Sequence, residues 1–102
     1  MKRPLWLRDS DDHFTTTWEG KAYTLTRHQR AEWWLHEGEP SLEPTDFALD
    51  GAWRNIPAAQ EGAAIWLHGW RVDPPCAEGG TVLYRRGEER RPYSVLRAEL
   101  AH

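Results

Sequence analysis

Two histidines and a glutamate recur at every fourth position within RHQRAEWWLHE, at His28, Glu32 and His36. Imidazole nitrogens and carboxylate oxygens are common zinc ligands, so this spacing on one flank of a helix could hold a metal ion. However, two helical turns separate His28 from His36 by about 12 Å, which is too far for both to bind one ion on a straight helix. We therefore interpret the three side chains as a solvated helix flank and expect no metal.

Two further groups could carry chemistry but lack the partners that it needs. The stretch DSDDH contains Asp9, Asp11, Asp12 and His13 without the glycine and terminal glutamate of a calcium-binding loop, so we expect a turn. The single cysteine, Cys76, lies between a proline and an alanine, with no base near it in the sequence to activate the thiol. We expect no catalytic residue, no cofactor and no enzymatic activity.

Arginine dominates the basic side chains and suits phosphate contacts. Of the 13 basic residues 11 are arginine, whose planar guanidinium can bind phosphate through two hydrogen bonds. Four of them bracket a glycine-containing stretch near the C-terminus: Arg85, Arg86, Arg90 and Arg91. If this stretch is a hairpin tip, these side chains could reach the phosphates of DNA. Alternatively, Glu88 and Glu89 neutralise part of the cluster, which is then only a solvated hairpin end.

The distribution of charge favours the C-terminal half as the half that contacts an anion. Residues 1–50 contain 6 basic and 10 acidic side chains, whereas residues 51–102 contain 7 basic and 6 acidic side chains. The formal net charge of the whole chain is -3. The acidic first half would not favour DNA, which leaves a protein partner as an alternative.

The stretch IPAAQEGAAIWLHGW predicts the clearest helix, over residues 57–68, because Pro57 stands at its start and Gly69 follows its end. Its outward face offers few side chains that read bases. The candidates are Gln60 on the helix, with Arg54 and Asn55 just before it. The helix is therefore either a recognition helix or only a helix of the core.

The chain contains 7 tryptophans, more than so small a core can bury completely, so some should lie at a binding surface. On a helical wheel of residues 27–37, Trp33 points away from the apolar face and should be exposed. Ile65 lies on the flank of the helix over 57–68. Exposed tryptophan is a residue type that dominates protein interfaces, so Trp33 and Ile65 are the candidate protein-binding residues.

Turn and cap patterns divide the rest of the chain into short elements. FTTTWEGKAYTLT alternates along its length around Gly20 and predicts a β-hairpin over residues 14–26. Thr26 and Gly38 provide the start and stop of a helix over residues 27–37. The remaining predicted elements are a short helix over 44–50, a strand over 70–72 and two strands in TVLYRR and RPYSVLR.

From Thr26 to Arg97 this order of elements resembles the winged-helix form of the helix-turn-helix superfamily. The resemblance rests on FALDG as the end of the second helix, AWRN as the turn, IPAAQEGAAIWLHGW as the third helix and TVLYRRGEERRPYSVLR as the wing. It implies one α+β domain over residues 1–102, with an N-terminal β-hairpin, three helices and a C-terminal antiparallel β-hairpin wing. It also implies that the third helix enters the major groove while the wing touches the DNA backbone.

Two functions follow as expectations. The first is a small DNA-binding or transcription-associated protein that holds double-stranded DNA through the wing arginines, with Arg54, Asn55 and Gln60 nearest the bases. The second is a protein–protein interaction module, such as an inhibitor, adaptor or accessory subunit, that uses Trp33 and Ile65. One cysteine permits no internal disulfide, and no apolar run approaches the roughly 18 residues that span a membrane, so we expect a cytoplasmic protein without membrane contact.

Overall fold

The computed structural model describes residues 1–28, 31–38, 48–73 and 82–101, which belong to two compact units. The N-terminal unit is Pro4–Ala63, and the C-terminal unit combines Met1–Arg3 with Ala64–His102. No described helix is both long and apolar enough to cross a membrane.

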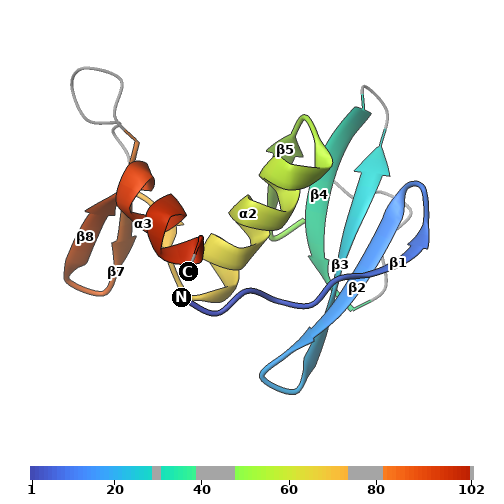
Figure 1. Cartoon of the computed structure of the whole chain (residues 1–102), viewed down its shortest axis with the longest axis horizontal. Coiled ribbons are helices and arrows are strands. Elements are labelled where there is room, and N and C mark those ends of the chain that lie inside the picture. Colours follow the sequence, from blue (N-terminus) through green and yellow to red (C-terminus); the bar gives the residue numbers. More distant parts are fainter. Residues whose placement is uncertain (29–30, 39–47, 74–81, 102) are drawn as a thin grey trace. The chain divides into compact units, whose positions relative to one another are not determined.

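The N-terminal unit is built on a five-stranded antiparallel sheet in which each strand pairs with the next one along the chain (Figure 1). Its strands are β1 (Leu7–Ser10), β2 (His13–Trp18), β3 (Lys21–His28), β4 (Glu32–Glu37) and β5 (Asp50–Trp53). The β2–β3 turn consists of Glu19 and Gly20, both at positive φ (50° and 81°), which is the backbone of a tight two-residue hairpin loop. The predicted hairpin over 14–26 is thus confirmed.

The core of this unit lies on one face of the sheet. Leu25 is the register partner of Phe14 on β2 and of Leu35 on β4, and all three side chains are buried. Paired residues project to the same face of an antiparallel sheet, so this row is continuous across three strands. Helix α2 (Ile56–Leu67) packs through Gly62 against Trp53 of β5, because a Cβ on Gly62 would stand 2.4 Å from the indole ring.

The predicted helix over residues 27–37 is wrong, because β3 and β4 occupy most of this stretch. Within β4, Trp33 and Leu35 are on the face of the core row, while Trp34 and His36 project to the opposite face. Helix-like cap spacing is a local preference, and pairing of six residues of β4 with β3 outweighs it. The predicted helix over 44–50 falls mainly on residues outside those described, and Asp50 begins β5.

Helix α2 confirms the helix predicted over 57–68, with its start one residue earlier at Ile56. Asn55 caps it, since its Oδ1 accepts a hydrogen bond from the Ala58 N–H at 2.9 Å. Gly69, at φ 93°, ends it, and the Trp70 N–H donates back to the Ile65 carbonyl at 3.2 Å.

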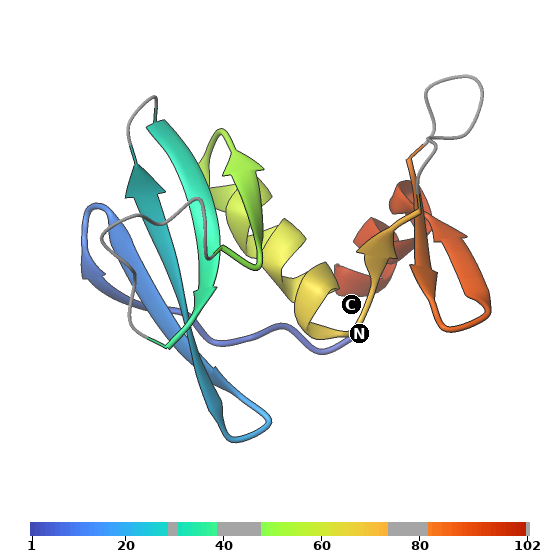
Figure 2. The ribbon, with the colours of Figure 1, turned by 180° about the vertical axis from the view of Figure 1, so that it is seen from behind.

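The C-terminal unit contains a three-stranded antiparallel sheet and helix α3 (Tyr93–Leu100), which lies beside the β7–β8 hairpin in Figure 2. Its strands are β6 (Arg71–Val72), β7 (Leu83–Arg86) and β8 (Glu89–Pro92). The buried core cluster of this unit comprises Ala64, Ile65, Trp70, Leu96 and Leu100. The N-terminus is hydrogen-bonded to helix α3 of this unit, because the Met1 ammonium donates to the Glu99 carbonyl at 2.9 Å.

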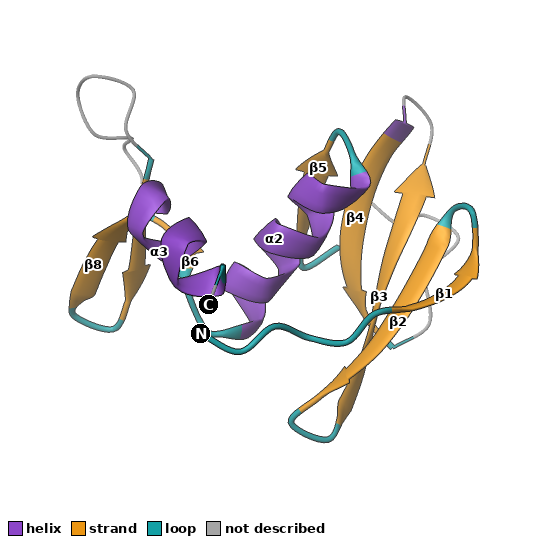
Figure 3. Ribbon diagram, in the orientation of Figure 1, coloured by secondary structure: helices purple, strands orange, loops and turns teal. Residues whose placement is uncertain are grey.

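The predicted arrangement of three helices followed by a wing is therefore wrong, although the chain does combine helices with antiparallel strands. Figure 3 shows strands as the main element of the N-terminal unit, and the described residues contain two α-helices, not three. The strand over 70–72 and the β7–β8 hairpin are confirmed, but the strand expected in RPYSVLR ends at Pro92. From Tyr93 onward the chain is helical, because Leu96 and Leu100 share one buried helix face.

Candidate functional site

A surface pocket of about 430 Å³ lies on the N-terminal unit where α2 begins. Three of its lining residues are arginines, which come from three separate places: β1, β3 and the turn before α2. The full lining is Arg8, Asp11, Arg27, Ala31, Trp33, Arg54, Asn55 and Ile56. The pocket therefore has the residue composition of a candidate anion site.

Strand register places two of these arginines on the core face of the sheet. Arg8 on β1 pairs with Phe14, and its guanidinium carbon lies 5.3 Å from the centre of that ring. Arg27 on β3 pairs with Trp33 on β4. Register partners share a face of the sheet, so Arg8 and Arg27 project from the same face as the buried rings of Phe14 and Trp33.

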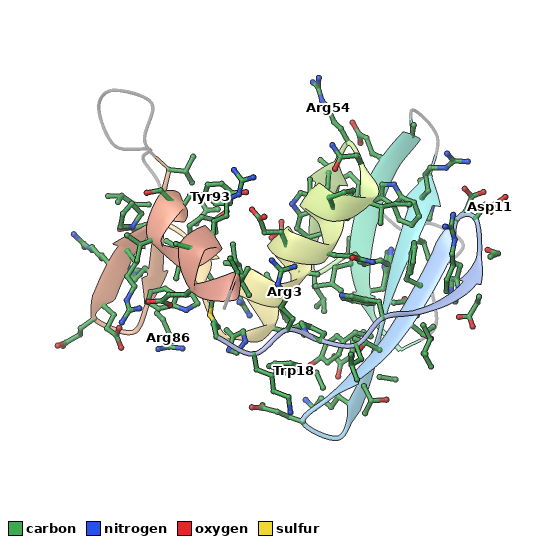
Figure 4. All side chains as sticks on the ribbon, viewed as in Figure 1. Arg3, Asp11, Trp18, Arg54, Arg86 and Tyr93 are labelled. Carbon is green, nitrogen blue, oxygen red and sulfur yellow. The ribbon has the colours of Figure 1, made fainter. Side chains whose placement is uncertain are left out.

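Carboxylates of the β1–β2 turn pair with Arg8 and Arg27, whereas the Arg54 side chain pairs with no described residue. Arg8 Nη2 lies 3.4 Å from Asp11 Oδ1, and Arg27 Nη2 lies 2.5 Å from Asp12 Oδ1. Arg54 forms no hydrogen bond or ion pair with any described residue. Figure 4 shows its side chain extending outward from the turn between β5 and α2, and shows Asp11 at the tip of the β1–β2 turn. To bind a ligand, Arg8 and Arg27 must therefore give up a carboxylate, whereas Arg54 gives up no contact with the described part of the chain.

The N-terminus of α2 contributes an electrostatic potential that favours an anion, but it offers few free hydrogen-bond donors. The positive end of the helix dipole lies beside Asn55 and favours an anion. Pro57 has no N–H, and the N–H of Ala58 is already bound to the Asn55 side chain. A ligand would therefore depend on the arginine side chains for its hydrogen bonds.

Comparison with known proteins adds no family to this description. No family model, no curated protein and no solved structure matches the chain. The case for a function therefore rests on the geometry of the chain itself.

The pocket includes part of the predicted nucleic-acid site. Arg54 and Asn55 line it, whereas Gln60, one turn further along α2, does not. Arg8 and Arg27 were missed as site residues. The alternation of Tyr23, Leu25 and Arg27 was the available indication, because it places Arg27 on the apolar face of a strand once residues 27–37 are not read as a helix.

The arginines of the predicted wing mostly bind groups of their own unit. Arg90 Nε lies 3.2 Å from Asp73 Oδ2, and Arg91 pairs with Glu99 and, at 3.3 Å, with Glu89. Arg86 is also occupied: it donates to the His68 carbonyl at 3.2 Å and lies 3.6 Å from Glu89. The side chain of Arg85 is exposed and forms no hydrogen bond or ion pair with any described residue.

Trp70 adds a second attachment for two of these arginines. The guanidinium carbons of Arg86 and Arg91 lie 4.5 Å and 5.5 Å from the centre of its ring system. The ring is 1 % exposed, so the two cations cover a core side chain. The sequence indicated the pairing of Arg86 and Arg91 with Glu89, but it did not indicate their contacts with the Trp70 ring.

The two predicted protein-binding residues are buried, so the expectation that Trp33 is exposed is wrong. Trp33 is 3 % exposed and packs against Phe14, with ring centres 5.5 Å apart. Ile65 is 1 % exposed within the core of the C-terminal unit. The helical wheel placed Trp33 incorrectly because its segment is a strand, in which the inward residues alternate.

The histidines considered for a metal site lie on the sheet face opposite the core row. The rings of His28 and His36 meet edge to face with centres 5.8 Å apart, and His28 Nε2 lies 2.6 Å from Thr26 Oγ1. Burial lowers the pKa of both histidines, and the charge of His28 further lowers that of His36. No group of three or more ligand residues suited to a metal occurs in the described part of the chain.

The acidic stretch DSDDH forms the end of β1, the β1–β2 turn and the start of β2. Asp11 and Asp12 form the turn between β1 and β2, which confirms the expected turn. His13 begins β2, and its Nδ1 lies 2.9 Å from Asp9 Oδ2. Cys76 lies outside the described residues.

Proposed function

We propose that this chain is a non-enzymatic binding protein that holds nucleic acid by its phosphates at the α2 pocket. The observation that carries the proposal is the lining of this pocket by three arginines, one of which, Arg54, pairs with no described residue. Guanidinium groups match phosphate oxygens in geometry and charge. Phosphate contacts also supply nearly all of non-specific affinity for DNA.

The pocket supports this proposal better than the hairpin does. Arg86, Arg90 and Arg91 would have to leave carboxylates or carbonyls of the C-terminal unit before they could bind phosphate. The Arg54 side chain has no hydrogen bond or ion pair with a described residue to lose, and it stands near the positive end of a helix dipole. A cytoplasmic location, expected from a chain with one cysteine, belongs to the same proposal, and cell fractionation would test it.

Fluorescence anisotropy with a labelled DNA duplex over a series of salt concentrations tests this proposal. We expect the logarithm of the binding constant to fall linearly with the logarithm of salt concentration. Arg54→Ala should weaken binding to any sequence and reduce the salt slope by about one, because one phosphate contact is lost.

Two control variants locate the contact. Lys21→Ala removes the same charge at the start of β3, outside the pocket lining, and should change binding little. Arg85→Ala removes the exposed hairpin arginine, which is also outside the pocket lining, and as the second control it should likewise change binding little. Absence of binding by the unchanged protein at low salt would contradict the proposal, and so would an equal loss in the Lys21 and Arg54 variants.

Exposed leucines beside an edge strand favour a protein partner as the second candidate. Leu5 and Leu7 are 86 % and 69 % exposed, and β1 is the outermost strand of its sheet. An unpaired edge strand can accept an extended segment of another protein. If this is the function, Leu5→Ser with Leu7→Ser should abolish capture of a partner from nuclease-treated lysate, whereas the Arg54 variant should retain it.

A further inference from the structure

The acidic turn between β1 and β2 occupies the arginines of the pocket in the free protein. The side chains of Asp11 and Asp12 pair with Arg8 and Arg27 at 3.4 Å and 2.5 Å. Backbone contacts fasten the same turn, since the Arg27 N–H donates to the Asp12 carbonyl at 3.0 Å. Carboxylates tethered to the chain act at a high effective concentration. A ligand must therefore bind these two guanidiniums better than a carboxylate does.

The charge of the incoming phosphate decides this exchange. A phosphodiester inside a strand carries one negative charge, as does the carboxylate that it would displace. A terminal phosphomonoester carries roughly 1.5 to 2 negative charges at neutral pH and three strong acceptor oxygens. It can accept hydrogen bonds from two guanidiniums at once and still face the third. An exchange that gains nothing for a diester is therefore favourable for a monoester.

Building on the proposed nucleic-acid binding, we infer that the pocket takes the terminal phosphomonoester of a nucleic-acid strand in preference to its internal phosphodiesters. The pocket is open to solvent, and its volume of about 430 Å³ lies within the size range of small-ligand sites. This is room for a terminal nucleotide. Arg54, exposed and without a described partner, supplies the cation that closes over the phosphate.

The test compares two single-stranded oligonucleotides of one sequence, labelled at the 3′ end and ending in either a 5′-phosphate or a 5′-hydroxyl. Anisotropy at low salt should show at least about tenfold tighter binding of the 5′-phosphate form to the unchanged protein. A third oligonucleotide with its phosphate at the 3′ end and its label at the 5′ end establishes which terminus is held. Equal binding of phosphorylated and hydroxyl ends overturns this inference but leaves the proposed function standing. Absence of binding to every oligonucleotide and to duplex DNA overturns both.

Asp12→Asn tests the exchange itself. It releases Arg27 from its carboxylate, so binding of the 5′-hydroxyl form should tighten and the preference for the phosphate should shrink. Asp9→Asn is the matched control, because Asp9 is an acid of β1 that pairs with His13 and not with a pocket arginine. Equal effects of the two variants overturn the exchange, since general electrostatics would then explain both.

Competition identifies the source of the phosphate. A nucleoside 5′-monophosphate should displace the 5′-phosphate oligonucleotide at a lower concentration than inorganic phosphate does. A phosphoserine peptide should displace it no better than inorganic phosphate. If the peptide competes as well as the nucleotide, the assignment to nucleic acid is overturned.

Discussion

The β7–β8 hairpin and the pocket at the start of α2 both contain several arginines, but the partners of these arginines differ. In the hairpin, Arg86 and Arg91 lie against the ring of Trp70, which is buried, and both pair with carboxylates of their own unit. In the pocket, Arg54 pairs with no described residue, and Arg8 and Arg27 pair with a turn at the surface.

The two groups of arginines differ in the contacts that each side chain must break before it can bind a phosphate. Arg86 and Arg91 would each give up a ring contact and an ion pair within the C-terminal unit. Arg54 has no described contact to give up and would lose only side-chain freedom. Several arginines close together in a sequence are therefore not enough to indicate a phosphate site, because their availability depends on partners from elsewhere in the fold.

Trp70→Ala should have the largest effect, because it removes the ring on which the hairpin arginines rest. Trp70 is 1 % exposed and belongs to the core of the C-terminal unit. Truncation of a buried tryptophan costs about 3–5 kcal/mol of unfolding free energy. Urea denaturation of the full chain measures this loss. Val95→Ala, at a 41 % exposed position of α3, is the control and should cost far less. A loss for Trp70→Ala no larger than for the control would contradict the structural role of the hairpin arginines.

Gly62→Ala should have the next largest effect, this time on the unit that carries the pocket. The added Cβ would stand 2.4 Å from the Trp53 ring, and overpacking of this kind costs about 1–3 kcal/mol. Alanine gains only about 1 kcal/mol in helix propensity, so the net change should be destabilising. Because Trp53 precedes Arg54, DNA binding should weaken as well. A Trp53→Leu background should relieve the loss if the clash is its cause, and a stabilised single variant would show that the ring moves aside freely.

The parts of the fold that sequence could predict depend on nearby residues. Helix α2 has both ends marked, by Asn55 and Pro57 at its start and by Gly69 after its end. The two confirmed hairpins have glycine at positive φ in their turns, at Gly20 and Gly87. Caps and turns act over three or four residues, so the sequence displays them directly.

The element that was predicted incorrectly and the site residues that were missed depend on partners far away along the chain. β4 is a strand because it pairs with β3 and β5, and its own residues also satisfy a helical pattern. Arg90 is occupied by Asp73, 17 positions earlier, and this pairing requires the whole three-stranded sheet. Two of the three pocket arginines have the same origin, since strand register brings Arg8 and Arg27 to one pocket. Single-sequence reasoning found Arg54 and Asn55 because they adjoin the helix start.

Acid should weaken the unit that carries the pocket, because His36 is buried in its sheet. Burial and the charge of His28 lower the pKa of His36 below its ordinary value of 6.5, and its Nε2 has no hydrogen-bond partner among the residues that the structure describes. The unfolded chain therefore takes up a proton at a higher pH than the folded chain. The contribution to stability is complete above pH 6.5 and is lost as the pH falls toward the lowered folded pKa. Urea denaturation at several pH values should show this decline, and His36→Leu should reduce it. An identical pH dependence in the variant would exclude His36 as its cause.

The smallest effects come from single arginines, and they separate the two regions most directly. Arg91→Ala removes pairs with Glu99 and Glu89 and a contact with Trp70, which together should cost about 1 kcal/mol of unfolding free energy. Arg54→Ala removes no contact with a described residue and should change the unfolding free energy by less than about 0.5 kcal/mol. In DNA binding the order should reverse, with the Arg54 variant weakened and the Arg91 variant close to the unchanged protein. Arg91→Ala could instead lower DNA affinity without lowering stability. In that case the ion pairs of Arg91 do not stabilise the C-terminal unit, and the phosphate contact belongs to the hairpin.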